Sequence, residues 1–503
     1  MNTTQVAQLG VAMERYGALA TPLEFSYVNS ELAKLSQTVG FPMDQMRFAI
    51  CLFVAYPFAW LLRRLPSPTA KHWLNIFVGV SMAQFVYATG WLLSFVSAAV
   101  TYALVKFAPV RYMPYIVFVA NMAFVAILHI YRMAVDYMGW SMDATASQML
   151  LLIKLTSFAF NYHDGVVAST MDIEETDSPA RIKVKKSRKA LAITTLPSLQ
   201  EFYGYVYCFT TFLAGPSFEY REYIDSVTGA KFIYKGERRR VSSSKAAVTK
   251  FSIGVFFMAL LARFGEYANV RAILHVKESL PIKWGRIMVA LFLTRGKYYT
   301  AWKLAEGSTI LSGTGFEGFD ESGNPKGWNA VSNVDILGFE LAHSVRDLSR
   351  AWNKGTQNWL ERYVYTRTGN SLIATYSCSA VWHGFYPGYY FFFLTDVCLT
   401  PSSTTDTLSL VPLATSVNRL ARRHVRPYFL QADGSSAALK PLYDLVGMLC
   451  TSVLINYLAV SFVVLGWNDS MHGFQSMHFA GHIGLLATYL LLSAVPVKKA
   501  KKM

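Results

Sequence analysis

Long runs of apolar residues, separated by short polar or charged breaks, dominate the pattern along this chain. The early runs lie at about residues 46–62, 74–89, 91–107 and 113–131. The later runs lie at about residues 251–263, 287–302, 373–399, 443–465 and 479–495. Because an α-helix needs about 20 mostly apolar residues to cross the hydrocarbon core of a bilayer, the pattern predicts an all-α polytopic membrane protein.

Three stretches depart from this pattern. Residues 149–160 are amphipathic and contain Lys154, which favours a tilted or partly interfacial helix. Residues 202–214 are apolar but short and end at Gly215-Pro216, which indicates a re-entrant or broken helix. Residues 334–367 form a helical stretch with too many charges to face lipid. We therefore expect about eleven spans or partial spans in a single domain that comprises residues 1–503.

Composition and charge support a membrane protein and indicate how it is oriented. Only 16% of the residues are charged, whereas soluble domains usually carry about a quarter. The 47 Lys and Arg exceed the 31 Asp and Glu, so the net charge is +16. Two basic blocks, residues 181–189 and 235–245, are expected in the cytosol by the positive-inside rule, with an even number of crossings between them.

The two ends of the chain carry weaker signals. The N-terminal segment, residues 1–40, lacks the charged-then-apolar pattern of a cleavable signal peptide. The basic tail, residues 496–503, fits a dilysine retrieval signal, which predicts an endoplasmic reticulum membrane protein with a cytosolic C-terminus. A basic stop next to the last span explains the same lysines equally well.

Several other functional classes are excluded or disfavoured by the sequence. The five cysteines are scattered and form no CxxC pair, so neither a disulfide framework nor a zinc module is expected, and nucleic acid is not an expected partner. His478 and His482 are four residues apart and would share a helix face, but no third metal ligand lies near them. Residues 313–318 match GxGxxG, yet no predicted strand precedes them, so a dinucleotide site is not expected. We expect no metal and no bound cofactor.

Polar residues inside apolar surroundings are the best candidates for chemistry, because a membrane interior makes them costly. His383 lies within the run 373–399, and its neutral imidazole can accept a proton near pH 7. About thirty residues earlier, Asn353 lies on a stretch of helical character, and its amide can donate to a developing oxyanion. Structural roles remain open for both: a hydrogen-bonded buried histidine, and a helix cap or interhelical hydrogen bond.

These residues resemble the signature of a known family. Trp382-His383-Gly384 in an apolar helix, preceded by Trp352-Asn353, is similar to the membrane-bound O-acyltransferase (MBOAT) family and more specifically to its lysophospholipid acyltransferase branch. Supporting stretches occur in the same order at residues 160–165, 213–220, 312–316 and 380–390. The GxGxxG match is then one of the family's loops.

The resemblance implies a fold, a reaction and site residues. The fold would be a bundle of about eleven transmembrane or re-entrant helices around a buried catalytic chamber. The reaction would transfer a fatty acyl group from the co-substrate acyl-CoA to the free hydroxyl of a lysophospholipid, with His383 as general base and Asn353 as the residue that positions the substrate and stabilises the oxyanion. Residues expected to contact substrate are Trp352, Lys354, Trp359, Arg362, Trp382, Gly384, Tyr389, Gly215, Pro216, Glu219, Tyr220, His163 and Asp164. Membrane lipids are the surroundings, and the chain could also form a homodimer.

A transporter or scramblase is the alternative from another functional class. In that case His383 and Asn353 would line a path for a solute or lipid. Such proteins are commonly built from repeated halves with paired broken helices, and the sequence shows no repeat and a single candidate broken helix, near Gly215. The absence of a repeat favours the acyltransferase.

Overall fold

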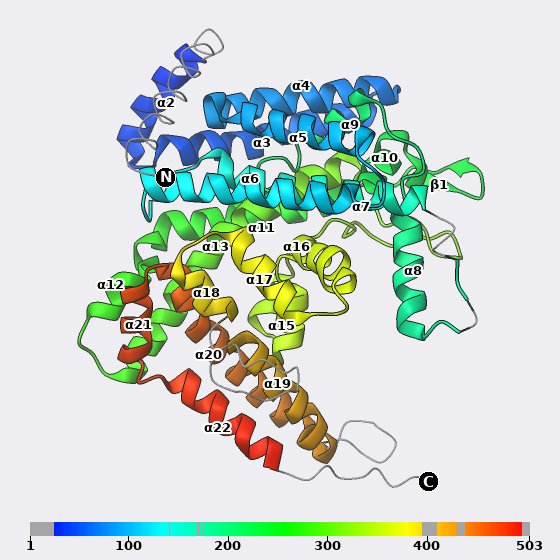
Figure 1. The fold of residues 1–503 in the computed structure, drawn as a ribbon. Coiled ribbons are helices and arrows are strands. Elements are labelled where there is room, and N and C mark those ends of the chain that lie inside the picture. The colour runs from blue at the N-terminus through cyan, green and yellow to red at the C-terminus, as the bar shows by residue number, and fades with distance from the viewer. Residues whose placement is uncertain are drawn as a thin grey trace. The chain divides into compact units, whose positions relative to one another are not determined.

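The computed structural model describes residues 25–139, 141–167, 172–174, 176–394, 410–429 and 438–494. Within these residues the regular structure is helical apart from one antiparallel hairpin, in which β1 (Ile233–Tyr234) pairs with β2 (Glu237–Arg238) (Figure 1). The prediction of an all-α protein is therefore confirmed. The basic tail and most of the N-terminal segment lie outside the described residues.

The chain divides into two compact units. Unit 1 comprises Met1–Phe256, Thr300–Asn333 and Glu361–Arg367. Unit 2 comprises Phe257–Tyr299, Val334–Leu360 and Thr368–Met503. Because each unit takes segments from distant parts of the sequence, its interior depends on contacts that are not local. The expectation of a single domain stays a prediction.

The first four apolar runs form helices close to the predicted limits. After α2 (Ser26–Val39) they are α3 (Met43–Arg64), α4 (Pro68–Tyr87), α5 (Trp91–Phe107) and α6 (Met113–Val135), with a short 3-10 turn, η2 (Ala88–Gly90), between α4 and α5. Each presents an apolar side outward, as Phe77 and Val119 illustrate with 74% and 65% exposure. Outward apolar side chains of this size are what a helix in contact with lipid requires.

The interfacial interpretation of residues 149–160 is wrong. These residues belong to α7 (Ala144–Val166), which packs against α5, α6 and α8 (Pro179–Leu191). Every side chain from Leu151 to Asn161 is buried. The polar ones are satisfied inside the protein: the ammonium group of Lys154 donates to the backbone carbonyls of Tyr205 and Val206. The helix is amphipathic because its polar side faces protein carbonyls and not headgroups.

The prediction of a broken helix before Gly215-Pro216 is confirmed. The helix α9 (Leu199–Val206) is only eight residues long, and an irregular buried stretch continues to the start of α10 (Tyr220–Thr228). A helix end in an apolar interior leaves carbonyls without partners, and each would cost free energy if unsatisfied. Buried lysines supply the missing donors, since Lys154 serves the end of α9 and Lys71 donates to the carbonyl of Val227 near the end of α10 at 2.9 Å.

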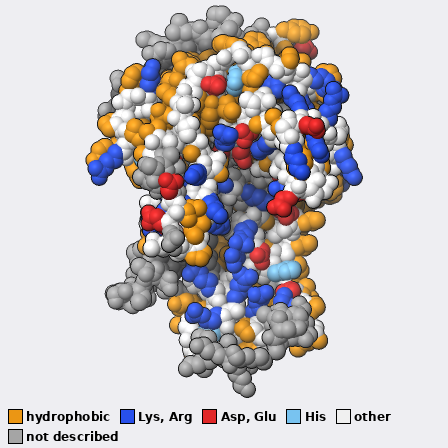
Figure 2. Space-filling model, turned by 90° about the vertical axis from the view of Figure 1, so that its right-hand side faces the viewer, with side chains coloured by type: hydrophobic (Ala, Val, Ile, Leu, Met, Phe, Trp, Pro, Cys, Tyr) orange, Lys and Arg blue, Asp and Glu red, His pale blue; other side chains and the backbone are white. Residues whose placement is uncertain are grey.

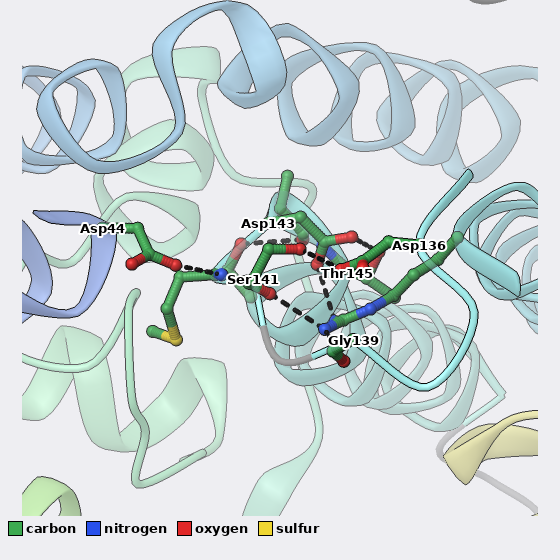
Figure 3. Close-up of polar contacts among 10 residues, drawn as sticks. Asp44, Asp136, Gly139, Ser141, Asp143 and Thr145 are labelled. Carbon is green, nitrogen blue, oxygen red and sulfur yellow. Dashed lines mark hydrogen bonds and ion pairs between the residues drawn. The ribbon is translucent and has the colours of Figure 1, made fainter. Parts of the chain in front are cut away.

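The connection between α6 and α7 is held by charged side chains (Figure 3). Asp143 caps α7 by accepting from the backbone N–H of Thr145 at 3.0 Å. Arg132 donates to Asp143 at 3.2 Å and to the carbonyls of Gly139 and Ser141. The carboxylate of Asp44 in α3 accepts from the N–H of the residue after Ser141 at 2.7 Å. These contacts tie one end of α7 to α3 and α6.

The remaining helices include two departures from prediction. In chain order they are η4 (Ala230–Phe232), α11 (Ser244–Phe264), η5 (Gly265–Ala268), α12 (Val270–His275), α13 (Leu280–Ser312), α14 (Ile336–Glu340), α15 (Val345–Ala351), α16 (Lys354–Trp359), η6 (Leu360–Val364), η7 (Tyr365–Arg367), α17 (Leu372–His383), α18 (Pro387–Leu394), α19 (Leu410–His424), η8 (Arg426–Phe429), α20 (Lys440–Val464), α21 (Trp467–Ser476) and α22 (Ala480–Ala494). The single run 373–399 is divided because Gly384 adopts φ +123° and Pro387 starts a new helix. The stretch 334–367 is divided into short helices.

Within the described parts of the chain, five stretches are long and apolar enough to cross a membrane. They are Met43–Arg64, Pro68–Phe107, Met113–Val135, Ser244–His275 and Lys440–Val464. The bent pair α21 and α22, with an angle of 68°, could form a sixth. Figure 2 shows apolar side chains spread over one face of the molecule among groups of Lys and Arg. The prediction of a polytopic membrane protein is confirmed, whereas the count of about eleven spans or partial spans and the buried chamber stay predictions.

Candidate active site

His383 is the last residue of α17 and is surrounded by aromatic rings of unit 2. Its ring lies 5.3 Å from that of Phe393 in a stacked arrangement, and 5.0 Å from that of Phe462 in an edge-on arrangement, measured between centroids. The rings of Trp382 and Tyr389 lie at 4.7 and 5.5 Å. Rings on several sides restrict the rotation of the imidazole, which is half-buried.

Gly388 allows the close helix packing that holds these aromatic rings around His383. Its N–H donates to the carbonyl of Leu465 at 2.7 Å, and a Cβ added to it would lie 2.0 Å from the carbonyl oxygen of Ser461. Only glycine allows α18 to approach the end of α20 this closely. The approach brings Tyr389 of α18 against Phe462 of α20, with ring centroids 4.9 Å apart.

Asn353 occupies the break between α15 and α16. Its backbone is left-handed, with φ 42° and ψ 52°, so the helical character predicted for this stretch is interrupted here. Its side chain caps no backbone N–H of α16, and its carbonyl oxygen instead accepts the hydroxyl of Thr356 at 3.0 Å. That hydrogen bond orients the amide and leaves its nitrogen to donate to another group.

Trp352 is held in an aromatic box beside Asn353. Its ring lies 4.8 Å from that of Phe339 and 5.8 and 5.9 Å from those of Tyr298 and Tyr299. Because Trp352 is extended and anchored by these rings, the position of the next residue, Asn353, is fixed by the packing of unit 2.

A second aromatic contact links the helices that carry the two candidate catalytic residues. The ring of Trp359, at the end of α16, lies 6.4 Å from that of Trp382 in α17. Trp359 is 1% exposed and Trp382 is 4% exposed. The two buried rings thus contact each other inside unit 2, the unit that contains both Asn353 and His383.

A second group of the predicted substrate contacts lies in unit 1. The carboxylate of Glu219 accepts from the amide of Asn161 at 2.9 Å, from the hydroxyl of Tyr363 at 3.0 Å and from the guanidinium of Arg362 at 3.0 Å. Asp164 pairs with both terminal nitrogens of Arg367. These residues thus join α7 and the start of α10 to the segment that directly follows α16 in the chain.

The positions of the remaining predicted substrate contacts say less about how a substrate would bind. His163 contacts Asp164 at 3.1 Å, and Tyr220 is a buried part of the aromatic core of unit 1. Gly215 has φ +75° and precedes Pro216 through a cis peptide bond. Lys354 is half-buried at the first position of α16. Their roles as substrate contacts stay predictions.

Comparison with known proteins identifies the family. The model of the MBOAT, membrane-bound O-acyltransferase family, matches residues 130–460, which is more than half of the chain. The protein belongs to the membrane-bound O-acyltransferase family. All residues proposed for the site, from His163 to Tyr389, lie inside the matched region.

Relatives of this MBOAT protein cover most of its length. A Schizosaccharomyces pombe protein named lysophospholipid acyltransferase is 31% identical over 90% of this chain and 86% of its own length. A Saccharomyces cerevisiae protein of the same name is 29% identical over 93% of this chain and 77% of its own. The Gallus gallus protein named membrane-bound glycerophospholipid O-acyltransferase 2 is 30% identical over 94% of this chain and 89% of its own.

The structure of this MBOAT protein also shows an ion pair beside the candidate site that the sequence analysis did not predict. Arg295 makes two hydrogen bonds of 2.8 Å to the carboxylate of Glu340, and Tyr299 donates to the same carboxylate at 2.6 Å. Arg295 also donates to Asn456 at 2.9 Å. Because Tyr299 and Phe339 form part of the box around Trp352, this ion pair supports the site. The sequence did contain a sign of this ion pair, because Arg295 is a charged residue inside the apolar run 287–302. A polar residue in apolar surroundings was also the reason for choosing His383 as a candidate.

The histidine pair His478 and His482 and the GxGxxG match at residues 313–318 were not expected to bind a metal or a dinucleotide, and the structure shows what each of them forms. His478 precedes α22 in a left-handed conformation, so it does not share a helix face with His482, contrary to prediction. His482 instead contacts the hydroxyl of Tyr457 at 2.5 Å. Among the described residues, no group of three His, Cys, Asp or Glu side chains could hold a metal ion. Residues 313–318 form a loop after α13, with Gly313 at φ +100°.

Proposed function

We propose that this MBOAT protein transfers a fatty acyl group from acyl-CoA to the free hydroxyl of a lysophospholipid. Relatives that cover most of the chain are named for action on lysophospholipids, which supports this acceptor. The observation that supports the mechanism is the contact between the rings of Trp359, at the end of α16, and Trp382, the neighbour of His383 in α17, within the unit that also contains Asn353.

The chemistry follows from what each group can do. A neutral imidazole nitrogen of His383 takes the proton of the lysophospholipid hydroxyl as that oxygen attacks the thioester carbonyl carbon. The carbonyl oxygen becomes an oxyanion, to which the amide nitrogen of Asn353 donates a hydrogen bond. The tetrahedral intermediate then collapses, the carbon–sulfur bond breaks, and the sulfur leaves as coenzyme A with the proton from His383. No covalent enzyme intermediate is needed because the thioester is already activated.

The proposal extends to location and orientation. The protein lies in the endoplasmic reticulum membrane with its C-terminus in the cytosol, acyl-CoA enters from the cytosolic side, and the lysophospholipid enters from the bilayer. The aromatic rings around His383 restrict access of water, which would limit wasteful hydrolysis of the thioester.

The test uses membranes that contain the full-length protein, labelled oleoyl-CoA and a panel of lysophospholipids. Wild type should form diacyl phospholipid, and His383→Ala should lose it nearly completely at equal expression. The matched control is His343→Ala, an exposed histidine of the same unit, which should keep wild-type activity. Substantial activity in His383→Ala would refute the assigned base. Movement of lipid by wild type without any acyl transfer would favour the scramblase.

A further inference from the structure

The hairpin β1–β2 turns one of its two sides toward the protein. Side chains alternate along a strand, and Tyr234 pairs with Glu237, so these two lie on the same side, which we call the inner side. The hydroxyl of Tyr234 donates to the carbonyl of Glu321 at 2.6 Å, and its ring lies 5.6 Å from that of Phe319. Arg239 lies on the inner side too, since its guanidinium carbon is 4.7 Å from the centre of the Tyr234 ring. The inner side thus packs against the loop that follows α13.

The other side of the hairpin, which we call the outer side, is exposed. Ile233 pairs with Arg238, so both lie on it. The backbone N–H of Arg239 donates to the carbonyl of Phe232 at 2.8 Å, so the pairing continues past β2 and the alternation places Arg240 on the outer side as well. Ile233 is 51% exposed, and both arginines of the outer side are exposed. The outer side therefore presents a large apolar side chain together with two cationic ones.

The positive charge of the outer side is not neutralised by the protein. The side chains of Arg238, Arg240 and Lys235, which lies in the turn of the hairpin, are exposed and form no ion pair or hydrogen bond with the residues that the structure describes. Glu237, the acidic residue of the hairpin, lies on the inner side. The three basic side chains are therefore free to bind an external anion.

The hairpin is attached to the ends of two apolar stretches that are long enough to cross a membrane. Arg63, in the last turn of α3, donates to the carbonyl of Val241 and to the hydroxyl of Ser243, and its guanidinium carbon lies 5.4 Å from the centre of the Phe232 ring. Ser243 directly precedes α11. Because α3 and α11 both belong to these stretches, the contacts place the hairpin at the membrane surface where α3 ends and α11 begins.

Side chains of the two helices mark the level of the lipid beside the hairpin. Trp60 of α3 is 50% exposed, and the guanidinium carbon of Arg64 lies 3.5 Å from the centre of its ring. An exposed tryptophan and an arginine at a helix end are typical of the interface between membrane and water. In α11, Val248 is 61% exposed and lies about 6 Å along the helix axis from Ser244, the first residue of that helix. The apolar lipid region therefore begins about one helical turn from the hairpin.

We propose that the outer side of the hairpin binds anionic lipid headgroups of the adjoining leaflet. Arg238, Arg240 and Lys235 offer charge and N–H donors to headgroup phosphates and carboxylates, and anionic lipids attract basic residues next to a membrane span. The apolar side chain of Ile233 can enter the boundary between headgroups and acyl chains. Figure 2 views the side of the molecule on which Figure 1 draws β1, and Lys and Arg side chains are numerous there.

The test uses the purified full-length protein in liposomes, with a fluorophore attached through Ser242→Cys in a variant without the native cysteines. Ser242 is exposed and lies between the hairpin and α11. Half-quenching should need an about fivefold lower mole fraction of nitroxide-labelled phosphatidylserine than of nitroxide-labelled phosphatidylcholine. Raising the salt from 0.1 to 1 M shortens the Debye length from about 10 to about 3 Å and should remove most of this difference. Equal quenching by the two lipids at low salt would overturn the proposal.

Arg240→Gln and Arg239→Gln are a matched pair, since they remove the same charge from neighbouring residues on opposite sides of the hairpin. Arg240→Gln should weaken quenching by phosphatidylserine about fivefold, because one basic residue near an anionic surface contributes about 1 kcal/mol. Arg239→Gln should stay within about twofold of wild type. An equal loss in both variants at unchanged Tm would mean that net charge alone acts, which contradicts the proposal.

A charge-conserving variant keeps the test decisive if Arg239→Gln lowers the Tm. Arg240→Lys should quench as wild type does, and equal quenching in Arg240→Lys and Arg240→Gln would overturn the proposal. Coenzyme A is added last, because its phosphates share the chemistry of a headgroup. The preference for phosphatidylserine should remain, and its removal by micromolar coenzyme A would assign the arginines to a soluble phosphate instead. None of these measurements involves acyl transfer, so their outcome is independent of the proposed function.

Discussion

At the scale of single residues, Asn353 and His383 are oriented by different forces. The amide of Asn353 is directed by one hydrogen bond from Thr356 and by a left-handed backbone, both of which set its direction sharply. The imidazole of His383 is held by packing against aromatic rings, which restricts the plane of the imidazole but does not specify the direction in which its nitrogens point. Asn353 should therefore be the more sensitive of the two to small changes in its neighbours.

Truncation of the amide tests its assigned role. Asn353→Ala should lower kcat about 10²- to 10³-fold with little change in KM, because an oxyanion donor acts mainly in the transition state. Thr356→Val removes only the hydrogen bond that orients the amide and should have a smaller effect in the same direction. Steady-state kinetics with varied acyl-CoA and varied lysophospholipid measure both. A rise in KM with unchanged kcat would instead indicate ground-state binding.

At the scale of elements, the interruptions of helices are as important as the helices. The helix α9 stops after eight residues inside unit 1, and Lys154 of α7 takes over the role of the missing backbone N–H donors. In unit 2, the glycine-dependent break between α17 and α18 puts His383 at a helix end among rings from α18 and α20. Both breaks are supported by a neighbouring helix, which supplies a donor in one case and close packing in the other.

Removal of the lysine that supports α9 should destabilise unit 1. Lys154→Met keeps most of the volume but leaves the carbonyls of Tyr205 and Val206 without this donor, at a cost of about 1–3 kcal/mol for each unsatisfied group. The measurement is thermal inactivation of the detergent-solubilised protein. Lys106→Met, the same change at an exposed position in the last turn of α5, is the control and should leave the inactivation temperature unchanged. Equal behaviour of the two variants would contradict the role of Lys154.

At the scale of the whole molecule, the path of the chain bears on its orientation in the membrane. The helical elements between the basic helix α8 and the hairpin β1–β2 are α9, α10 and η4, of eight, nine and three residues. None of them reaches the length of about 20 residues needed for one crossing. Because the chain between them cannot cross the bilayer as a helix, we predict that α8 and the hairpin lie on the same side of the membrane.

A labelling experiment tests that orientation. Single cysteines placed by Lys186→Cys or Lys235→Cys, in a variant without the native cysteines, should both react with a membrane-impermeant maleimide in sealed microsomes, whose outer face is cytosolic. Both positions are exposed, so access through the protein does not limit the reaction. Labelling of either one only after detergent is added would place it in the lumen and contradict the shared cytosolic side.

The sequence by itself determined where the long apolar helices lie, that several cross a membrane, and which two residues are the strongest candidates for chemistry. Those features depend on the length and polarity of local stretches, and α5 begins and ends at the predicted residues. Tertiary structure alone decided what the polar residues of those stretches face. Lys154 was assigned to an interface because its carbonyl partner lies 51 residues away, and Arg295 was missed because Glu340 lies 45 residues away. A buried charge is defined by its partner, and partners so distant in sequence are brought together only by packing.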